Sequence, residues 1–65
     1  MNDKYLYIEK LEEDGMVWHF IKVYSIVEYE WIIKQPADKW RGNIRNDKAL
    51  FHLSDDLYTW FVLSN

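Results

Sequence analysis

Apolar and polar side chains alternate along the first third of the chain with a period of two, as in β-strands. The segment "KYLYIEKL" (4–11) is rich in Tyr and Ile, and "MVWHFIKVY" (16–24) is apolar at both odd and even positions. Asp14-Gly15 lies between them, and this dipeptide strongly favours a two-residue hairpin turn. The pattern therefore predicts a β-hairpin with Gly15 at positive φ.

The turn also predicts which residues face each other across the hairpin. If Glu13 lies opposite Met16, Ile8 faces Ile21 and one face is aliphatic. The other face is then aromatic, and its members are Tyr5, Tyr7, Trp18, Phe20 and Tyr24. A chain of 65 residues has little material to cover both faces. We expect the aromatic face either to be covered by a strand over 57–63 or to bind a partner.

The segment "SIVEYEWIIKQP" (25–36) fits two structures. Ser25 and Glu28 form a capping box and Pro36 is a stop signal, which together favour a helix. The apolar residues nevertheless separate better with a period of two, and β-branched and aromatic types dominate. We therefore predict a strand here, with a helix as the alternative.

Short apolar segments alternate with turn residues in the second half of the chain. "PADKWRGN" (36–43) and "RNDK" (45–48) are turn-like, and "ALFHL" (49–53) predicts a strand. "SDD" (54–56) is either a turn or the start of a helix, whereas "LYTWFVL" (57–63) is rich in strand-favouring residues. We predict a final strand over this last segment.

These elements predict one small domain over 1–65 that is mainly β. The expected architecture is an antiparallel meander of about five or six short strands, forming a curved sheet or a small open barrel. The alternative is an α+β fold with helices near 25–35 and 55–63 packed on a sheet.

Composition and charge exclude several classes of protein. The chain has no cysteine, no leader-like segment and no apolar run of membrane-spanning length. We therefore expect a cytoplasmic protein that does not bind a membrane. The net charge of −3 argues against a general nucleic-acid binder. Basic residues are nevertheless concentrated in 39–48, where four of them accompany one acid.

The residue types needed for catalysis or metal binding form no recognisable motif. His19 and His52 are the only imidazoles, and each is expected to be an ordinary strand residue, His19 beside Lys10. Nucleophile motifs, metal-ligand spacings and phosphate loops are all missing. We therefore expect a non-enzyme that holds neither a metal nor a cofactor.

Two features of the sequence point to binding. In "KWRGNIR" (39–45) a Trp lies between two cations, which places a flat anchor beside charges that can dock on acidic groups. The aromatic face of the hairpin is the second feature. The candidate partner-binding residues are Tyr7, Trp18, Phe20, Lys39, Trp40, Arg41 and Arg45.

The leading interpretation is a small binding protein that docks on a larger host protein or complex, with a homodimer as another way to cover the apolar faces. Its most specific form is an inhibitor of the phage or mobile-element kind, such as an anti-defence, anti-CRISPR-like factor. Short length, many aromatics and an excess of residues with AT-rich codons favour it. The alternative is a small nucleic-acid-binding β-module that stacks bases on Trp40, which the acidic net charge disfavours.

Overall fold

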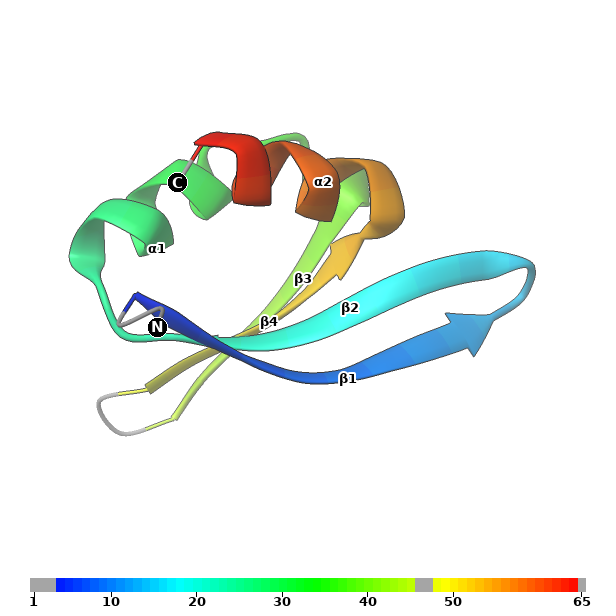
Figure 1. Ribbon diagram of the computed structural model, residues 1–65, viewed down its shortest axis with the longest axis horizontal. Coiled ribbons are helices and arrows are strands. Elements are labelled where there is room, and N and C mark those ends of the chain that lie inside the picture. Colours follow the sequence, from blue (N-terminus) through cyan, green and yellow to red (C-terminus); the bar gives the residue numbers. More distant parts are fainter. Residues whose placement is uncertain (1–3, 46–47, 65) are drawn as a thin grey trace.

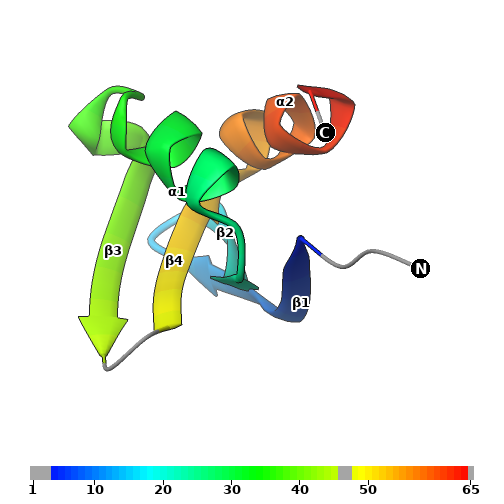
Figure 2. The same cartoon turned by 90° about the vertical axis from the view of Figure 1, so that its left-hand side faces the viewer.

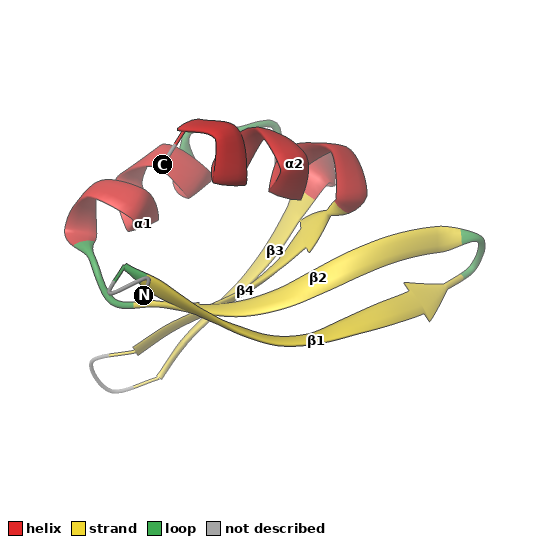
Figure 3. Ribbon diagram, viewed as in Figure 1, coloured by secondary structure: helices red, strands yellow, loops and turns green. Residues whose placement is uncertain are grey.

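The computed structural model describes residues 4–45 and 48–64, without the side chains of 43–48. In this part of the chain two helices pack on one face of a four-stranded antiparallel sheet (Figures 1 and 3). The strands are β1 (Tyr5–Glu13), β2 (Met16–Val23), β3 (Trp40–Arg45) and β4 (Lys48–Ser54). The helices are α1 (Ile26–Ile33) and α2 (Asp55–Ser64), with a 3-10 turn η1 (Ala37–Lys39) before β3.

The sheet has the order β1-β2-β4-β3, so it consists of two hairpins joined through β2 and β4. The predicted antiparallel sheet is confirmed in part: among the described residues it has four strands rather than five or six, and two helices pack on it, so the α+β alternative fits the structure. β3 begins at Trp40 within the segment 36–43 that was predicted as a turn. The prediction of a turn over 45–48 depends on residues 46–47, which lie outside the described residues.

The first strand prediction that fails is the one over 25–36. The hydroxyl of Ser25 accepts a hydrogen bond from Val27 N at 3.2 Å and caps α1. Glu28 and Ile32, one helical turn apart, are both buried, whereas Val27 is 66% exposed. This spacing of four suits a helix lying on a sheet, and burial of Ile32 outweighs the local preference for strand.

The strand predicted over 57–63 is also a helix. Ser54 is the residue before α2, and its buried hydroxyl accepts a hydrogen bond from Leu57 N at 3.4 Å. Leu57 and Phe61 are buried one turn apart, so α2 presents a helical stripe to the core. The alternative offered for 54–56, the start of a helix, is the correct one.

The hairpin turn and the predicted pairing from Glu13–Met16 as far as Lys10–His19 are confirmed, but the register predicted for Tyr5 to Ile8 is wrong. Asp14 and Gly15 both have positive φ, 52° and 78°, and Glu13 pairs with Met16. A β-bulge lies between Tyr7 and Glu9. A bulge adds one unpaired residue and exchanges the faces of the strand beyond it.

The bulge divides the expected aromatic face. Tyr5 now pairs with Val23 and Tyr7 pairs with Ile21, so both tyrosines lie on the side of the sheet that carries the helices. Trp18 and Phe20 stay on the opposite side. The single aromatic face predicted for the hairpin therefore does not exist.

The core lies between the sheet and the two helices (Figure 2). It is formed by Ile21, Val23, Ile32, Ala49, Phe51, Leu53, Leu57 and Phe61. Trp40 packs against it edge-on to Phe51, with 5.7 Å between ring centroids. A dense aromatic core is one way in which so short a chain can bury enough surface to fold.

Candidate functional site

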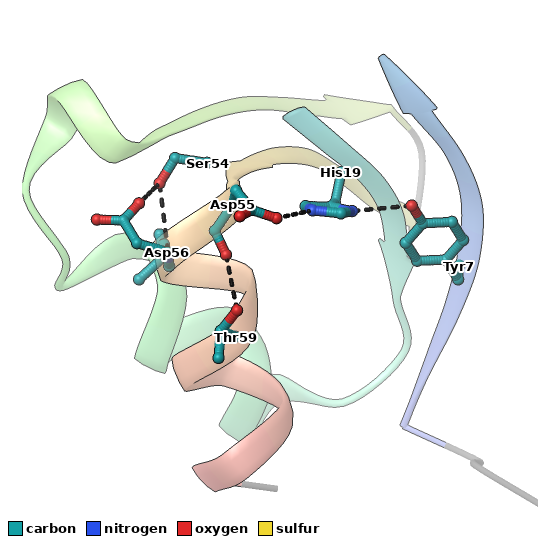
Figure 4. Close-up of polar contacts among 7 residues, drawn as sticks. Tyr7, His19, Ser54, Asp55, Asp56 and Thr59 are labelled. Atoms are coloured by element: carbon teal, nitrogen blue, oxygen red, sulfur yellow. Dashed lines mark hydrogen bonds and ion pairs between the residues drawn. The ribbon is translucent and has the colours of Figure 1, made fainter. Parts of the chain in front are cut away.

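A chain of three polar side chains connects β1, β2 and α2 (Figure 4). The hydroxyl of Tyr7 lies 2.8 Å from Nδ1 of His19, and Nε2 of His19 lies 2.7 Å from Oδ1 of Asp55. Because an ionised carboxylate only accepts hydrogen bonds, the N–H on Nε2 donates to Asp55. In the neutral imidazole Nδ1 then accepts the Tyr7 hydroxyl proton.

The environment of His19 fixes its ring. His19 is 8% exposed, and Tyr58 of α2 stacks on it with 4.4 Å between ring centroids. Burial, followed by the neighbouring hydroxyl of Tyr5, raises the pKa of Tyr58 above its ordinary value. Tyr58 therefore stays neutral beside the polar chain.

The order hydroxyl, imidazole, carboxylate is also found in activated nucleophiles, but the geometry here suits a clamp. In such triads both imidazole nitrogens are also hydrogen-bonded, but here the ring is only 8% exposed and is stacked on Tyr58, which restricts access to it. We interpret the three side chains as a connection that holds the long hairpin to the start of α2. The predicted position of His19 beside Lys10 is confirmed. The amino-acid sequence carried no signal for its contact with Asp55, which lies 36 residues further along the chain.

A second polar cluster involves the next acid of α2. Asp56 accepts hydrogen bonds from Lys39 Nζ at 2.8 Å and from the Ser54 hydroxyl at 2.6 Å. These bonds, that from Lys39 first, lower the pKa of Asp56 to about 2. The pair connects η1 to α2 on the side of the sheet that carries the helices.

Three of the predicted partner-binding residues meet on the opposite side of the sheet. Trp18 and Phe20 are in β2, and Arg41 is in β3. The guanidinium of Arg41 lies 4.4 Å from the ring centroid of Trp18 and 3.4 Å from Oε1 of Glu13. The Phe20 ring stacks on His52 at 4.3 Å, with an interplanar angle of 9°.

We call this side of the sheet the open face, because the two helices of the described residues lie on the other side (Figures 1 and 2). Strand register assigns to it the residues that alternate with the core positions. Its members include Leu6, Glu9, Leu11, Glu13, Met16, Trp18, Phe20, Lys22, Arg41, Leu50 and His52. Leu6 is 50% exposed, whereas Trp18 is only 4% exposed beneath Arg41.

The other predicted residues lie elsewhere. Trp40 belongs to the core boundary, and its Nε1 donates to the Gln35 carbonyl oxygen at 3.0 Å. Lys39 pairs with Asp56, and Tyr7 with His19, both on the helix side. Arg45 is the last residue of β3, and its side chain lies outside the described residues. The expected cluster of Lys39, Trp40 and Arg41 is therefore divided between the two sides of the sheet.

Comparisons with known proteins give no assignment, because no family model, curated protein or solved structure matches this chain. Within residues 4–45 and 48–64, no cluster of three or more His, Asp or Glu side chains could hold a metal ion. In the same part of the chain, neither helix is long and apolar enough to cross a membrane.

Proposed function

We propose that this chain is a small non-enzymatic binding protein that docks on a larger protein through the open face. The observation that carries the proposal is a sheet face that combines large apolar and aromatic residues with charged ones and over which neither described helix packs. Leu6 is half exposed on it, and Arg41, with 57% of its side chain exposed, adds a cation to the apolar surface. Aromatic residues and Arg are enriched in protein interfaces.

The same geometry favours a protein over a nucleic acid as the partner. Base stacking needs a free aromatic face. One face of Phe20 is covered by His52, and Trp18 lies beneath Arg41. Trp40, the residue expected to stack on bases, packs against the core instead. With a net charge of −3, a nucleic-acid-binding module is therefore the weaker candidate.

The most specific form of the proposal is an inhibitor or anti-defence factor of the phage type, such as an anti-CRISPR-like protein, acting in the cytoplasm. Short length, aromatic content and the residues with AT-rich codons support it, and the lack of cysteine fits a reducing compartment.

The test is capture of a partner from a bacterial lysate with the intact chain, followed by titration calorimetry with the identified protein. Leu6→Asp and Arg41→Glu should each weaken binding by more than tenfold, about 1.4 kcal/mol. Ile26→Asp is the matched control, because Ile26 is 65% exposed on α1, which packs on the other side of the sheet. Its affinity should stay within twofold of the wild type.

Three results would contradict the proposal. The first is a partner that binds both open-face variants as tightly as the wild type. The second is a steep dependence of DNA binding on salt, which would indicate a nucleic-acid binder. The third is a homodimer in sedimentation at micromolar concentration that Leu6→Asp dissociates, because a second copy would then occupy the open face.

A further inference from the structure

A groove lies on the helix side of the molecule, between the segment that follows α1 and the first turns of α2. It has a volume of about 290 Å³ and is lined by Gln35, Pro36, Lys39, Asp56, Leu57 and Trp60. Leu57 is 5% exposed and belongs to the core, whereas Trp60 is 65% exposed. None of the lining residues belongs to the open face, so the groove is a separate surface.

Hydrogen bonds hold the walls of the groove in place. The Gln35 side-chain amide donates to the Trp31 carbonyl oxygen at 3.0 Å, and the Gln35 carbonyl oxygen accepts from the Trp40 indole. Lys39 is held through its backbone N–H, which donates to the Pro36 carbonyl oxygen at 2.9 Å, and through its ion pair with Asp56. A surface that is ordered before binding loses less conformational entropy on binding.

The surroundings of the groove are acidic. Asp56 lines the groove and Asp38 lies beside Lys39 in η1; both acids are exposed, and Lys39 is the only base among the lining residues. The Asp56 side chain is 63% exposed although Lys39 pairs with it. A partner that approaches this end therefore meets more negative than positive charge, and cationic groups on the partner would be complementary.

We propose that the groove binds a protein segment that presents one large apolar side chain flanked by Lys or Arg. A volume near the lower end of ligand pockets suits a single side chain rather than an extended ligand. Trp60 supplies a large exposed aromatic surface that such a side chain would cover, and Trp is among the residues that contribute most to binding at interfaces. The flanking cations would lie beside Asp38 and Asp56.

The test uses synthetic pentapeptides and the intact, ¹⁵N-labelled chain. The first peptide has leucine between two pairs of lysines, the second has leucine between two pairs of glutamates, and the third has serine between two pairs of lysines. The lysine–leucine peptide should produce saturable shifts of the Trp60 indole N–H resonance. The other two peptides should each bind at least tenfold more weakly.

Two variants locate the site. Trp60→Ala should lower the affinity for the lysine–leucine peptide at least tenfold, as measured by titration on the Leu57 amide resonance. Leu63→Ala should bind within twofold of the wild type, because Leu63 is 79% exposed on the same helix but does not line the groove. Both side chains are exposed, so both variants should keep the wild-type circular dichroism spectrum. Arg41→Glu should also bind this peptide normally, which separates the groove from the open face.

Specific results would overturn the proposal. Equal binding of the glutamate peptide would exclude charge complementarity, and equal binding of the serine peptide would exclude the apolar side chain. If Trp60→Ala bound the lysine–leucine peptide with wild-type affinity, the groove would be excluded as the binding site. The absence of a saturable shift with this peptide would exclude it as well.

Discussion

The guanidinium of Arg41 in β3 covers the indole of Trp18 in β2, 4.4 Å from its ring centroid, although β4 lies between the two strands. The contact crosses the sheet on its open face and leaves Trp18 only 4% exposed. Arg41 therefore has a structural contact in addition to the binding role that we propose for it.

Replacing Arg41 with Ala should lower the free energy of unfolding by about 0.5–1 kcal/mol, because a cation–π contact at an exposed site is lost. Urea denaturation measures this change. Arg41→Lys is the control and should retain part of the contact, since the charge remains while the planar group is lost. Unchanged stability in Arg41→Ala would show that the contact contributes nothing to folding.

Gly42→Ala should destabilise the protein by about 1–3 kcal/mol through overpacking. A Cβ at this position would lie 2.8 Å from Cζ3 of Trp40 and 2.9 Å from Cε1 of Phe51. Both are ring atoms; Phe51 is buried in the core whereas Trp40 lies at its edge, so an added methyl group would displace Trp40. Thermal unfolding and the near-ultraviolet circular dichroism of the tryptophans report this displacement. A variant with wild-type melting temperature would contradict the prediction.

Gly15→Ala should cost about 1 kcal/mol for a different reason. The φ of Gly15 is +78°, which L-residues rarely adopt, although nothing lies within 4 Å of the added Cβ. The chain is short enough for chemical synthesis, so D-Ala at position 15 is the control. It should restore wild-type stability, because D-residues favour positive φ. Equal loss with both enantiomers would show that strain at φ is not the cause.

Stability should fall in alkaline solution as the pH rises above about 10. The pKa of Tyr58 is raised in the folded protein, first by burial and then by Tyr5, so the unfolded chain releases this proton at lower pH. The stabilisation is therefore complete below the unfolded pKa and is lost as the pH rises beyond it. Tyr58→Phe should flatten this loss in urea denaturation between pH 9 and pH 12, and an equally steep loss in that variant would contradict the prediction.

The contribution of Asp56 to the stability of the fold should be lost as the pH falls from about 4 to about 2. Its folded pKa is lowered to about 2, so its stabilisation is present above the ordinary carboxyl pKa and is lost as the pH falls through the folded value. The effect should be small, since the Asp56 side chain is 63% exposed. Denaturation of Asp56→Asn should show lower stability at pH 7 and a shallower decline in acid. An identical acid decline in both proteins would exclude this contribution.

Features that depend on neighbouring residues were readable from the amino-acid sequence. The hairpin turn at Asp14-Gly15 needs two residues that tolerate positive φ, and both are adjacent in the chain. The pairing of Leu11 with Trp18 follows directly from that turn. The cap at Ser25 and the alternative of a helix start at 54–56 are likewise local signals.

Features that depend on distant residues needed the tertiary structure. β-branched and aromatic residues over 26–33 and 57–63 favour strands locally. Both segments are nevertheless helices, because the helical conformation buries Ile32, Leu57 and Phe61 in the core with residues of β2 and β4. The bulge after Tyr7 moved both tyrosines to the helix side, where Tyr7 meets His19. Asp55 joins them only because α2 packs back on the sheet. Local propensities amount to a few tenths of a kcal/mol per residue, whereas burying one large apolar side chain contributes about 1.5–3 kcal/mol, so packing determines these positions.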